Sequence, residues 1–236
     1  MTKVEKFLMI IYNKAMKRIL SLIILMAAVM TMAAQNSTEN RHYCVDLGLP
    51  SGTLWATCNM GASKPESFGN YYAWGETSTK GSYYWNTYQH ANGYVELTRY
   101  CRKSDYGYNG FTDNLTMLLP VDDPAVAWGS GWRTPSKIQW DELLVNTTQK
   151  WTTRNGVKGM LFTSRKNGQT IFLPAAGYRE GSETRDAEFA GFYWSRSLYT
   201  GKPDNAWSLY FFSSDDCSTG YFDRIYGLSV RPIREK

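Results

Sequence analysis

The sequence predicts an α+β fold that is rich in loops, with short antiparallel strands and one or two helices. Three observations lead to it: a helical pattern at residues 134–148, a β-hairpin pattern at 160–173, and alternating apolar residues near the C-terminus. The chain has 20 glycines, and they are frequent between Gly61 and Gly131. This gives that stretch the composition of loops. With 236 residues, 43% of them hydrophobic, the chain has enough apolar material for a core.

The helix is predicted to begin at Thr134-Pro135, with the threonine as N-cap and the proline as first helical residue. Its apolar residues form two stripes, one of Trp140, Leu143 and Leu144 and one of Ile138 and Val145. A helix that is apolar on two sides is expected to be mostly buried. Residues 146–148 are expected to end it.

The hairpin is predicted from two apolar segments, 160–164 and 169–173, on either side of Asn167-Gly168. Asn-Gly tolerates the positive φ angles of a type I′ turn, whose twist suits paired strands. Pro174 is expected to end the second strand because proline lacks the N–H that a ladder needs.

Two further segments, 206–211 and 228–233, alternate with a period near two and are predicted to be half-buried strands. Residues 213–220 between them have the composition of a loop.

The N-terminal segment has the features of a secretory signal peptide. Lys17-Arg18 precede an apolar run over 19–30, and small residues follow at 31–35. The run is shorter than the ~20 residues of a membrane span. We expect a signal peptide at 1–34 that is cleaved near Ala34–Gln35, and Met16-Lys17-Arg18 would begin a normal signal, so 1–15 resemble a mis-assigned start.

The rest of the chain is expected to be a flexible arm at 35–42 and a single domain at 43–236, exported to the periplasm, the cell surface or the medium. No second apolar run of membrane length follows the signal, so no membrane span is expected after cleavage.

The net charge of +5 belongs mostly to the leader. Five basic residues and one acidic residue in 1–34 account for +4, which leaves +1 for 35–236. A nearly neutral body lacks the basic face that nucleic acids require, so nucleic acid is not expected as a partner.

Cysteine and histidine support no catalytic or metal site. Cys44, Cys58, Cys101 and Cys217 could form disulfides in an oxidising compartment by any of three pairings, or could be small buried hydrophobes. The two histidines, His42 and His90, do not complete a zinc motif or a recognisable triad. We therefore predict no catalytic residue, no metal and no cofactor.

Six blocks of the chain, in order, resemble the Fibrobacter succinogenes major paralogous domain. The similarity extends over about 43–233, and the blocks are 43–62, 69–76, 131–136, 172–179, 193–195 and 226–232. The segments 132–140 and 227–231 also resemble formylglycine-generating enzymes, a group similar to the variable proteins of diversity-generating retroelements. The resemblance implies a C-type-lectin-like domain and an exported protein of a gut Bacteroidetes species. Trp55, Trp74, Trp132 and Trp194 are expected to serve as core residues.

The function favoured by these observations is a non-catalytic binding module for an unknown surface glycan or protein. Its candidate surface is the C-terminal region, where aromatic and short polar residues mix as they do in paratopes. The candidate ligand-binding residues are Tyr199, Asp204, Asn205, Trp207, Tyr210, Asp215, Asp216, Tyr221, Asp223 and Tyr226.

Two alternatives remain. One is an accessory or tip component of a bacterial surface assembly. The other is an oxidase of the formylglycine-generating type, which the resemblance associates with two cysteines near the C-terminus, whereas Cys217 is the only one in the last third. The segment 202–205 is faintly similar to the proline-centred motif of calcium-dependent lectins, but it begins with lysine, so no calcium site is predicted.

Overall fold

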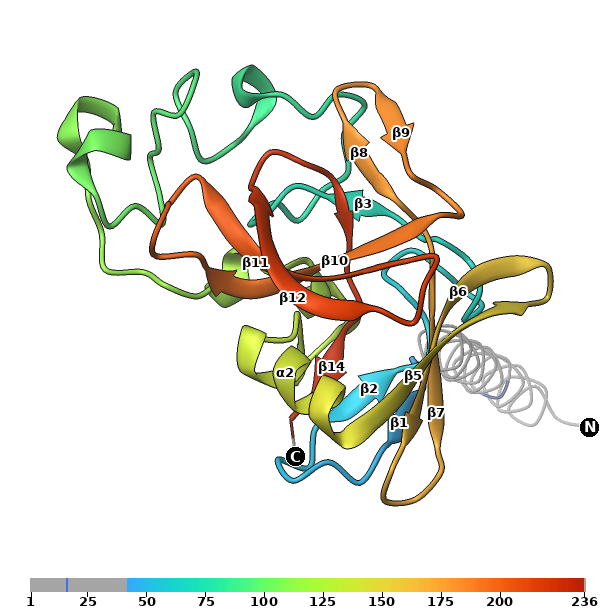
Figure 1. Ribbon diagram of the computed structural model, residues 1–236. Coiled ribbons are helices and arrows are strands. Elements are labelled where there is room, and N and C mark those ends of the chain that lie inside the picture. The colour runs from blue at the N-terminus through green and yellow to red at the C-terminus, as the bar shows by residue number, and fades with distance from the viewer. Residues whose placement is uncertain (1–15, 17–41, 236) are drawn as a thin grey trace, which may run out of the picture. The chain divides into compact units, whose positions relative to one another are not determined.

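The computed structural model describes residue 16 and residues 42–235, and these confirm a mixed α and β fold in which strands predominate (Figure 1). The predicted signal peptide, apart from Met16, and residues 35–41 of the predicted arm lie outside the described residues. His42–Lys236 form one compact unit. Its described part has one α-helix, α2 (Lys137–Asn146), and five 3-10 helices, at Trp85–Thr87, Ser104–Tyr106, Tyr108–Gly110, Pro120–Asp122 and Pro124–Trp128.

The first half of the unit holds short strands and the second half holds long ones. The first seven strands are β1 (Cys44–Asp46), β2 (Leu54–Ala56), β3 (Tyr71–Tyr72), β4 (Trp132–Arg133), β5 (Thr147–Arg154), β6 (Val157–Ser164) and β7 (Thr170–Pro174). The remaining strands are β8 (Tyr178–Glu180), β9 (Glu183–Arg185), β10 (Ala190–Leu198), β11 (Asn205–Phe212), β12 (Cys217–Asp223), β13 (Leu228–Ser229) and β14 (Ile233–Arg234). No strand lies between β3 and β4, which agrees with the loop composition predicted there.

A five-stranded sheet in the order β12-β11-β10-β13-β3 forms the centre of the domain, with α2 next to it (Figure 1). A four-stranded sheet, β1-β2-β14-β4, brings the first and last strands of the domain together. The meander β5-β6-β7 and the pair β8-β9 complete the fold. The central sheet therefore ends in an edge strand, β12, that comes from the predicted binding region.

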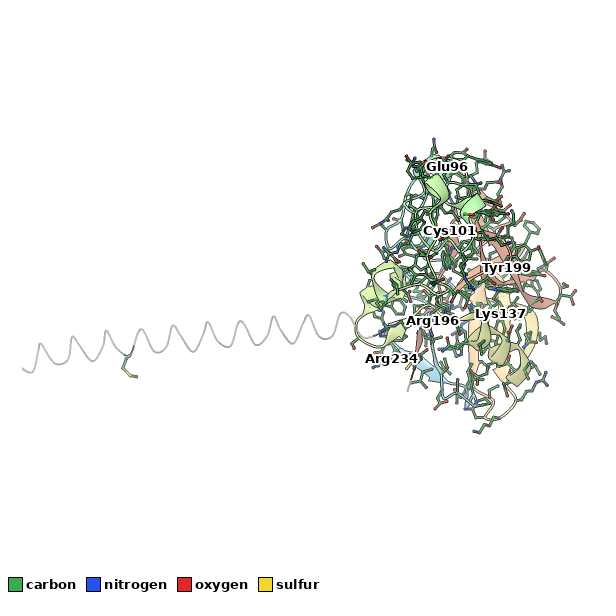
Figure 2. The ribbon with its side chains drawn as sticks, turned by 90° about the vertical axis from the view of Figure 1, so that its left-hand side faces the viewer. Glu96, Cys101, Lys137, Arg196, Tyr199 and Arg234 are labelled. Carbon is green, nitrogen blue, oxygen red and sulfur yellow. The ribbon has the colours of Figure 1, made fainter. Side chains whose placement is uncertain are left out.

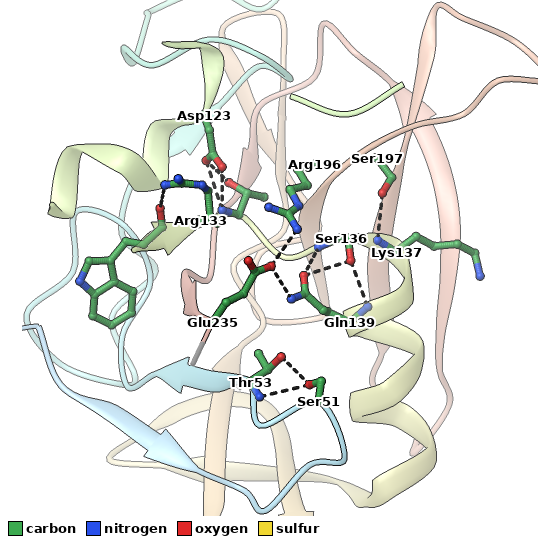
Figure 3. Close-up of polar contacts among 12 residues, drawn as sticks. Ser51, Thr53, Asp123, Arg133, Ser136, Lys137, Gln139, Arg196, Ser197 and Glu235 are labelled. Carbon is green, nitrogen blue, oxygen red and sulfur yellow. Dashed lines mark hydrogen bonds and ion pairs between the residues drawn. The ribbon is translucent and has the colours of Figure 1, made fainter. Parts of the chain in front are cut away.

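The helix begins two residues later than the sequence predicts, because Ser136 rather than Thr134 is its N-cap (Figure 3). The Ser136 Oγ accepts from the Gln139 N–H at 3.3 Å, and Gln139 Oε1 accepts from the Ser136 N–H at 2.8 Å. This is a capping box, which satisfies two otherwise unpaired donors. Thr134 instead donates its N–H and hydroxyl to Asp123, so tertiary contact decides between the two possible caps.

Only one of the two apolar stripes of α2 is buried. Trp140 and Leu143 are fully buried in a core cluster with Trp55, whose ring centroid lies 4.7 Å from that of Trp140. Ile138 and Val145 are 77% and 74% exposed, so the prediction of a helix buried on two sides is wrong. The reason is that the sheets cover one side of α2 and nothing in 42–235 covers the other.

The predicted hairpin is confirmed in its strands but not in its turn. β6 and β7 pair antiparallel, with Phe162 opposite Ile171. Gly168 has a φ of +72°, whereas Asn167 does not have positive φ, so the turn is not type I′. Instead the Asn167 side chain donates to the Asp46 carbonyl at 2.9 Å, a contact outside the hairpin.

The C-terminal segments differ in detail from the prediction. β11 is confirmed, but the predicted loop 213–220 is wrong at its end, because the β11–β12 ladder already pairs Phe211 with Cys217. The predicted strand 228–233 is two short strands, and all six residues are buried rather than half of them. The four tryptophans predicted as core, Trp55, Trp74, Trp132 and Trp194, are at most 5% exposed, which confirms that prediction.

Two fully buried arginines tie distant segments together. The Arg231 guanidinium donates to Asn59 Oδ1, the Ala56 carbonyl and the Phe172 carbonyl at 2.9–3.0 Å. Arg224 lies over the Trp74 ring at 4.8 Å and donates to three carbonyls and to the hydroxyl of Tyr88, which lies in the loop-rich segment. Hydrogen bonds from these two arginines to backbone carbonyls thus hold in place loops that are not part of a β-sheet.

All four cysteines are free thiols in the structure. Cys101 is buried, Cys58 and Cys217 are half-buried, and Cys44 is exposed. In the described part of the chain, no helix is long and apolar enough to cross a membrane.

Candidate functional site

Three of the predicted ligand-binding residues form an aromatic platform, which we define as Tyr199, Trp207 and Tyr221. Tyr199 directly follows β10, Trp207 belongs to β11 and Tyr221 to β12. Side chains alternate between the two faces of a strand, so Trp207 lies on the same face as Leu209 and Phe211. Those two residues pack with Trp140 and Leu143 of α2, which places the platform on the helix side of the central sheet.

The platform has a defined ring geometry. The rings of Tyr199 and Tyr221 are stacked, with centroids 4.0 Å apart and planes 2° apart. Trp207 meets both edge-on, at 5.2 Å and 6.2 Å. Tyr221 is 49% exposed and Tyr199 and Trp207 are half-buried, so the rings are held in place by one another while remaining accessible from solvent.

Polar groups of α2 border the platform. The Lys137 ammonium lies 4.8 Å above the Trp207 ring and 2.6 Å from a carboxylate oxygen of Asp141. The other Asp141 oxygen accepts from the Thr219 hydroxyl of β12 at 3.0 Å. Figure 2 shows Lys137 and Tyr199 on the same side of the domain. Lys137 and Asp141 were not among the predicted site residues, although their i, i+4 spacing on a helix was a usable signal.

Two other predicted residues, Tyr210 and Tyr226, lie in a second aromatic cluster. Tyr210 alternates with Leu209 and Phe211 and therefore points to the opposite face of the sheet. The other members of this cluster are Tyr178, Phe192, Phe212 and Phe222, and Phe212 is 47% exposed. The predicted surface is thus divided between the two faces of one sheet.

The acidic and amide residues near the start of β11 form a third group. Asp204 is paired with the Lys202 ammonium at 3.0 Å, and the Asn205 amide donates to Asp223 at 2.7 Å. Hydrogen bonding to Asp204 raises the pKa of Lys202, and burial raises the pKa of Asp223. The lysine that departs from the lectin motif therefore forms an ion pair with Asp204.

The last two predicted residues, Asp215 and Asp216, are exposed and lie between β11 and β12 at the end remote from Tyr221. Asp215 accepts from the Trp151 N–H of β5 at 2.7 Å. It therefore connects the two sheets and does not meet the aromatic platform.

A buried polar network that the sequence does not reveal surrounds His90. The ring Nε2 lies 2.8 Å from the Gly75 carbonyl and 3.9 Å from Asp122, whose carboxylate also contacts Arg99 at 2.9 Å and the Tyr100 hydroxyl. His90 and Asp122 are each 4% exposed. Burial, helped by the cations of Arg224 and Arg99, lowers the pKa of His90, against the Gly75 carbonyl and Asp122, which raise it.

This network makes stability depend on pH. The folded-state pKa of His90 lies below its ordinary value of about 6.5, so between the two pKa values the unfolded chain binds more protons than the folded one. The stability that comes from keeping His90 uncharged in the folded state is fully present above about pH 6.5, and it is lost as the pH falls toward the folded-state pKa. We expect the free energy of unfolding, measured with urea, to fall more between about pH 7 and 5 for the wild type than for His90→Gln.

Comparing the wild type with His90→Gln cancels the pH-dependent contributions of the other titrating groups. Burial raises the pKa of Asp123, so the stability contributed by this residue rises rather than falls as the pH is lowered. This contribution is the same in both proteins. Parallel pH profiles for the wild type and His90→Gln would contradict the prediction.

No family model, characterised protein or solved structure matches the chain. Within residues 42–235, no group of three or more histidine, cysteine and acidic side chains is arranged to hold a metal ion. The ring geometry and its neighbours on α2 define an aromatic surface with polar neighbours on a sheet flanked by a helix.

Proposed function

We propose that this protein is an exported, non-catalytic binding module that recognises a saccharide through the aromatic platform. The observation that carries the proposal is the rigid, solvent-accessible stack of Tyr199 and Tyr221 at right angles to Trp207. Sugar rings present C–H groups on their faces, and these pack against the electron-rich faces of aromatic rings. The rings need little ordering on binding because they already fix one another.

Polar groups beside the platform support the saccharide class. The Lys137 ammonium, the Asp141 carboxylate and the Thr219 hydroxyl provide donors and acceptors next to the rings. A sugar hydroxyl both donates and accepts hydrogen bonds, so it can pair with either kind of group. A surface of rings alone would suit an apolar ligand instead.

The state of Cys217 favours a binding module over an oxidase. Its thiol has no second cysteine in the last third of the chain, and burial raises its pKa to about 12. Thiolates, not thiols, bind metals and attack substrates. A thiol held protonated in this way is a poor nucleophile.

Export and a C-type-lectin-like fold are part of the same proposal. Export is supported by the order of basic, apolar and small residues in 17–35. The lectin-like fold is supported by the six resembling blocks and by the combination of mostly antiparallel strands, one α-helix in the described residues and the long loop-rich segment between β3 and β4.

A component of a surface assembly remains a second candidate, because of the aromatic cluster on the opposite face of the sheet. Phe212 is 47% exposed there and contacts the rings of Phe192 and Tyr210. Exposed aromatic clusters are typical of protein interfaces. The two candidate functions use opposite faces of the central sheet, so substitutions on one face distinguish between them.

The test of the platform is a glycan array followed by calorimetry with the saccharides that bind. We expect Trp207→Ala and Tyr199→Ala to weaken binding at least about tenfold, because truncating a central ring removes the contact area of a hot spot. Neither residue belongs to β12, the edge strand of the central sheet, so neither substitution alters that edge.

Tyr43→Ala is the matched control, since Tyr43 is 70% exposed and lies outside the platform. It should bind as the wild type does. Full binding by Trp207→Ala, or a saccharide lost equally by Tyr43→Ala, would contradict the proposal. Loss of binding in a Phe212→Ala variant alone would favour the surface on the opposite face.

A further inference from the structure

We propose that β12 is a dimerisation edge, at which two copies of this chain pair their β12 strands antiparallel about a two-fold axis at Gly220. The inference is independent of the ligand and goes beyond the binding function. Its supports are an unprotected sheet edge, a self-complementary register, and two opposite charges of α2 that the same symmetry would bring together.

The edge of β12 is open. The Arg224 N–H bonds the Asp204 carbonyl, and in an antiparallel ladder such pairs recur at every second residue. Phe222, Gly220 and Ser218 therefore bond β11, while the backbone groups of Tyr221 and Thr219 point outward. Within residues 42–235 no other strand pairs with β12 on that side.

The edge also lacks the features that usually prevent pairing. Natural edge strands carry lysine, proline or a bulge. β12 has the sequence Cys-Ser-Thr-Gly-Tyr-Phe-Asp, and its pairing with β11 runs without a shift from Asp223 to Cys217. Its one charged residue, Asp223, stands at the end of the strand. Such an edge is a template for another strand.

The strand is complementary to itself when the axis passes through Gly220. In that register Tyr221 pairs with the partner's Thr219, and Asp223 pairs with the partner's Cys217. No like charges meet, and the residue at the axis has no side chain. All the outward backbone groups of Thr219 and Tyr221 find partners, as an isologous interface requires.

Helix α2 is complementary in the same arrangement. Lys137 lies over Trp207, which is opposite Tyr221, whereas Asp141 bonds Thr219, so the two residues lie on either side of Gly220 along the strand. The two-fold axis reverses this order in the second copy. Lys137 therefore faces the partner's Asp141, and Asp141 faces the partner's Lys137.

The exposed apolar residues of α2, Ile138 and Val145, lie outside this contact. Ile138 is two residues before the buried Trp140, so it projects from the side of the helix that is turned away from the sheet, and Val145 shares that side. A few edge hydrogen bonds alone are too small an interface for a stable dimer, and the two symmetric ion pairs add to them.

The dimer would place two aromatic platforms on one continuous sheet. A two-fold axis perpendicular to an antiparallel pair keeps the same face on the same side, so both platforms would face one direction. Two linked sites raise the avidity for a repetitive ligand without new contacts.

The test is sedimentation equilibrium of the purified protein and two helix variants, Lys137→Glu and Val145→Glu. Both place a glutamate on α2, the first on the side next to β12 and the second on the side turned away from the sheet. Lys137→Glu sets like charges against the partner's Asp141, so we expect the dimer dissociation constant to rise by roughly tenfold or more, while Val145→Glu stays close to the wild type.

A second pair of variants tests the strand edge. Thr219→Pro removes an outward N–H, so the protein should become monomeric, whereas Thr219→Val keeps the N–H and should remain dimeric. Circular dichroism and thermal unfolding report whether Thr219→Pro folds; if it does not, the helix variants still decide. A monomeric wild type, or a dimer weakened by Val145→Glu and not by Lys137→Glu, would overturn the proposal.

Discussion

Replacing Arg231 with methionine is expected to lower the free energy of unfolding by about 3–5 kcal/mol. The side chain is fully buried and donates to β2, to β7 and to the loop that holds Asn59. Methionine has similar length but no donor, so three buried oxygens from three segments lose their partner. Burial lowers the pKa of Arg231 to about 10, which leaves the guanidinium charged at neutral pH.

Urea unfolding, followed by tryptophan fluorescence, measures the loss. Arg234→Met is the control, because Arg234 is exposed and its guanidinium lies 5.7 Å from the Trp132 ring centroid. It should change stability by no more than about 0.5 kcal/mol. A small effect of Arg231→Met would mean that water replaces the guanidinium and that the three segments are not tied through it.

Trp140→Ala is expected to lower the free energy of unfolding by about 3–5 kcal/mol. The indole is fully buried between α2 and the central sheet, packs on Trp55 and Tyr193, and donates to the Trp194 carbonyl at 3.2 Å. Its removal leaves a cavity and one buried acceptor without a donor.

Val145→Ala is the matched control on the same helix, since Val145 is 74% exposed. Its effect should stay within about 0.5 kcal/mol. The two variants share helix and backbone, so a difference between them reports packing and not helix propensity. Equal urea midpoints for Trp140→Ala and the wild type would show that α2 is not packed as described.

Local patterns predicted much of the fold correctly. The helix around Trp140, the β6–β7 hairpin and strand β11 all follow from apolar spacing, because a side chain's position along a helix or strand determines which neighbours it meets. The four core tryptophans followed from size, since large aromatic side chains bury the most area. These predictions needed no knowledge of which segments pair.

The three aromatic residues of the platform were among the residues predicted as candidates, but their arrangement in space was not predictable from the sequence. Trp207 and Tyr221 come from two strands and Tyr199 from the residue after a third, and only the β11–β12 register brings Trp207 opposite Tyr221. The same alternation sends Tyr210 to the other face. Lys137 and Asp141 join the platform because α2 packs beside β12, a contact between segments about 80 residues apart in the chain.

By itself, the sequence determined the α+β class, the main helix and hairpin and the identity of the core tryptophans, and the proposal of an export signal rests on it alone. Tertiary structure decided which of Thr134 and Ser136 caps α2, since Asp123 binds the threonine, and which stripe of α2 is buried. It also decided the partners of Arg231 and His90, whose burial no local pattern indicates. The physical reason is that periodicity and capping act between neighbours in the chain, whereas burial and pairing depend on which distant segments meet.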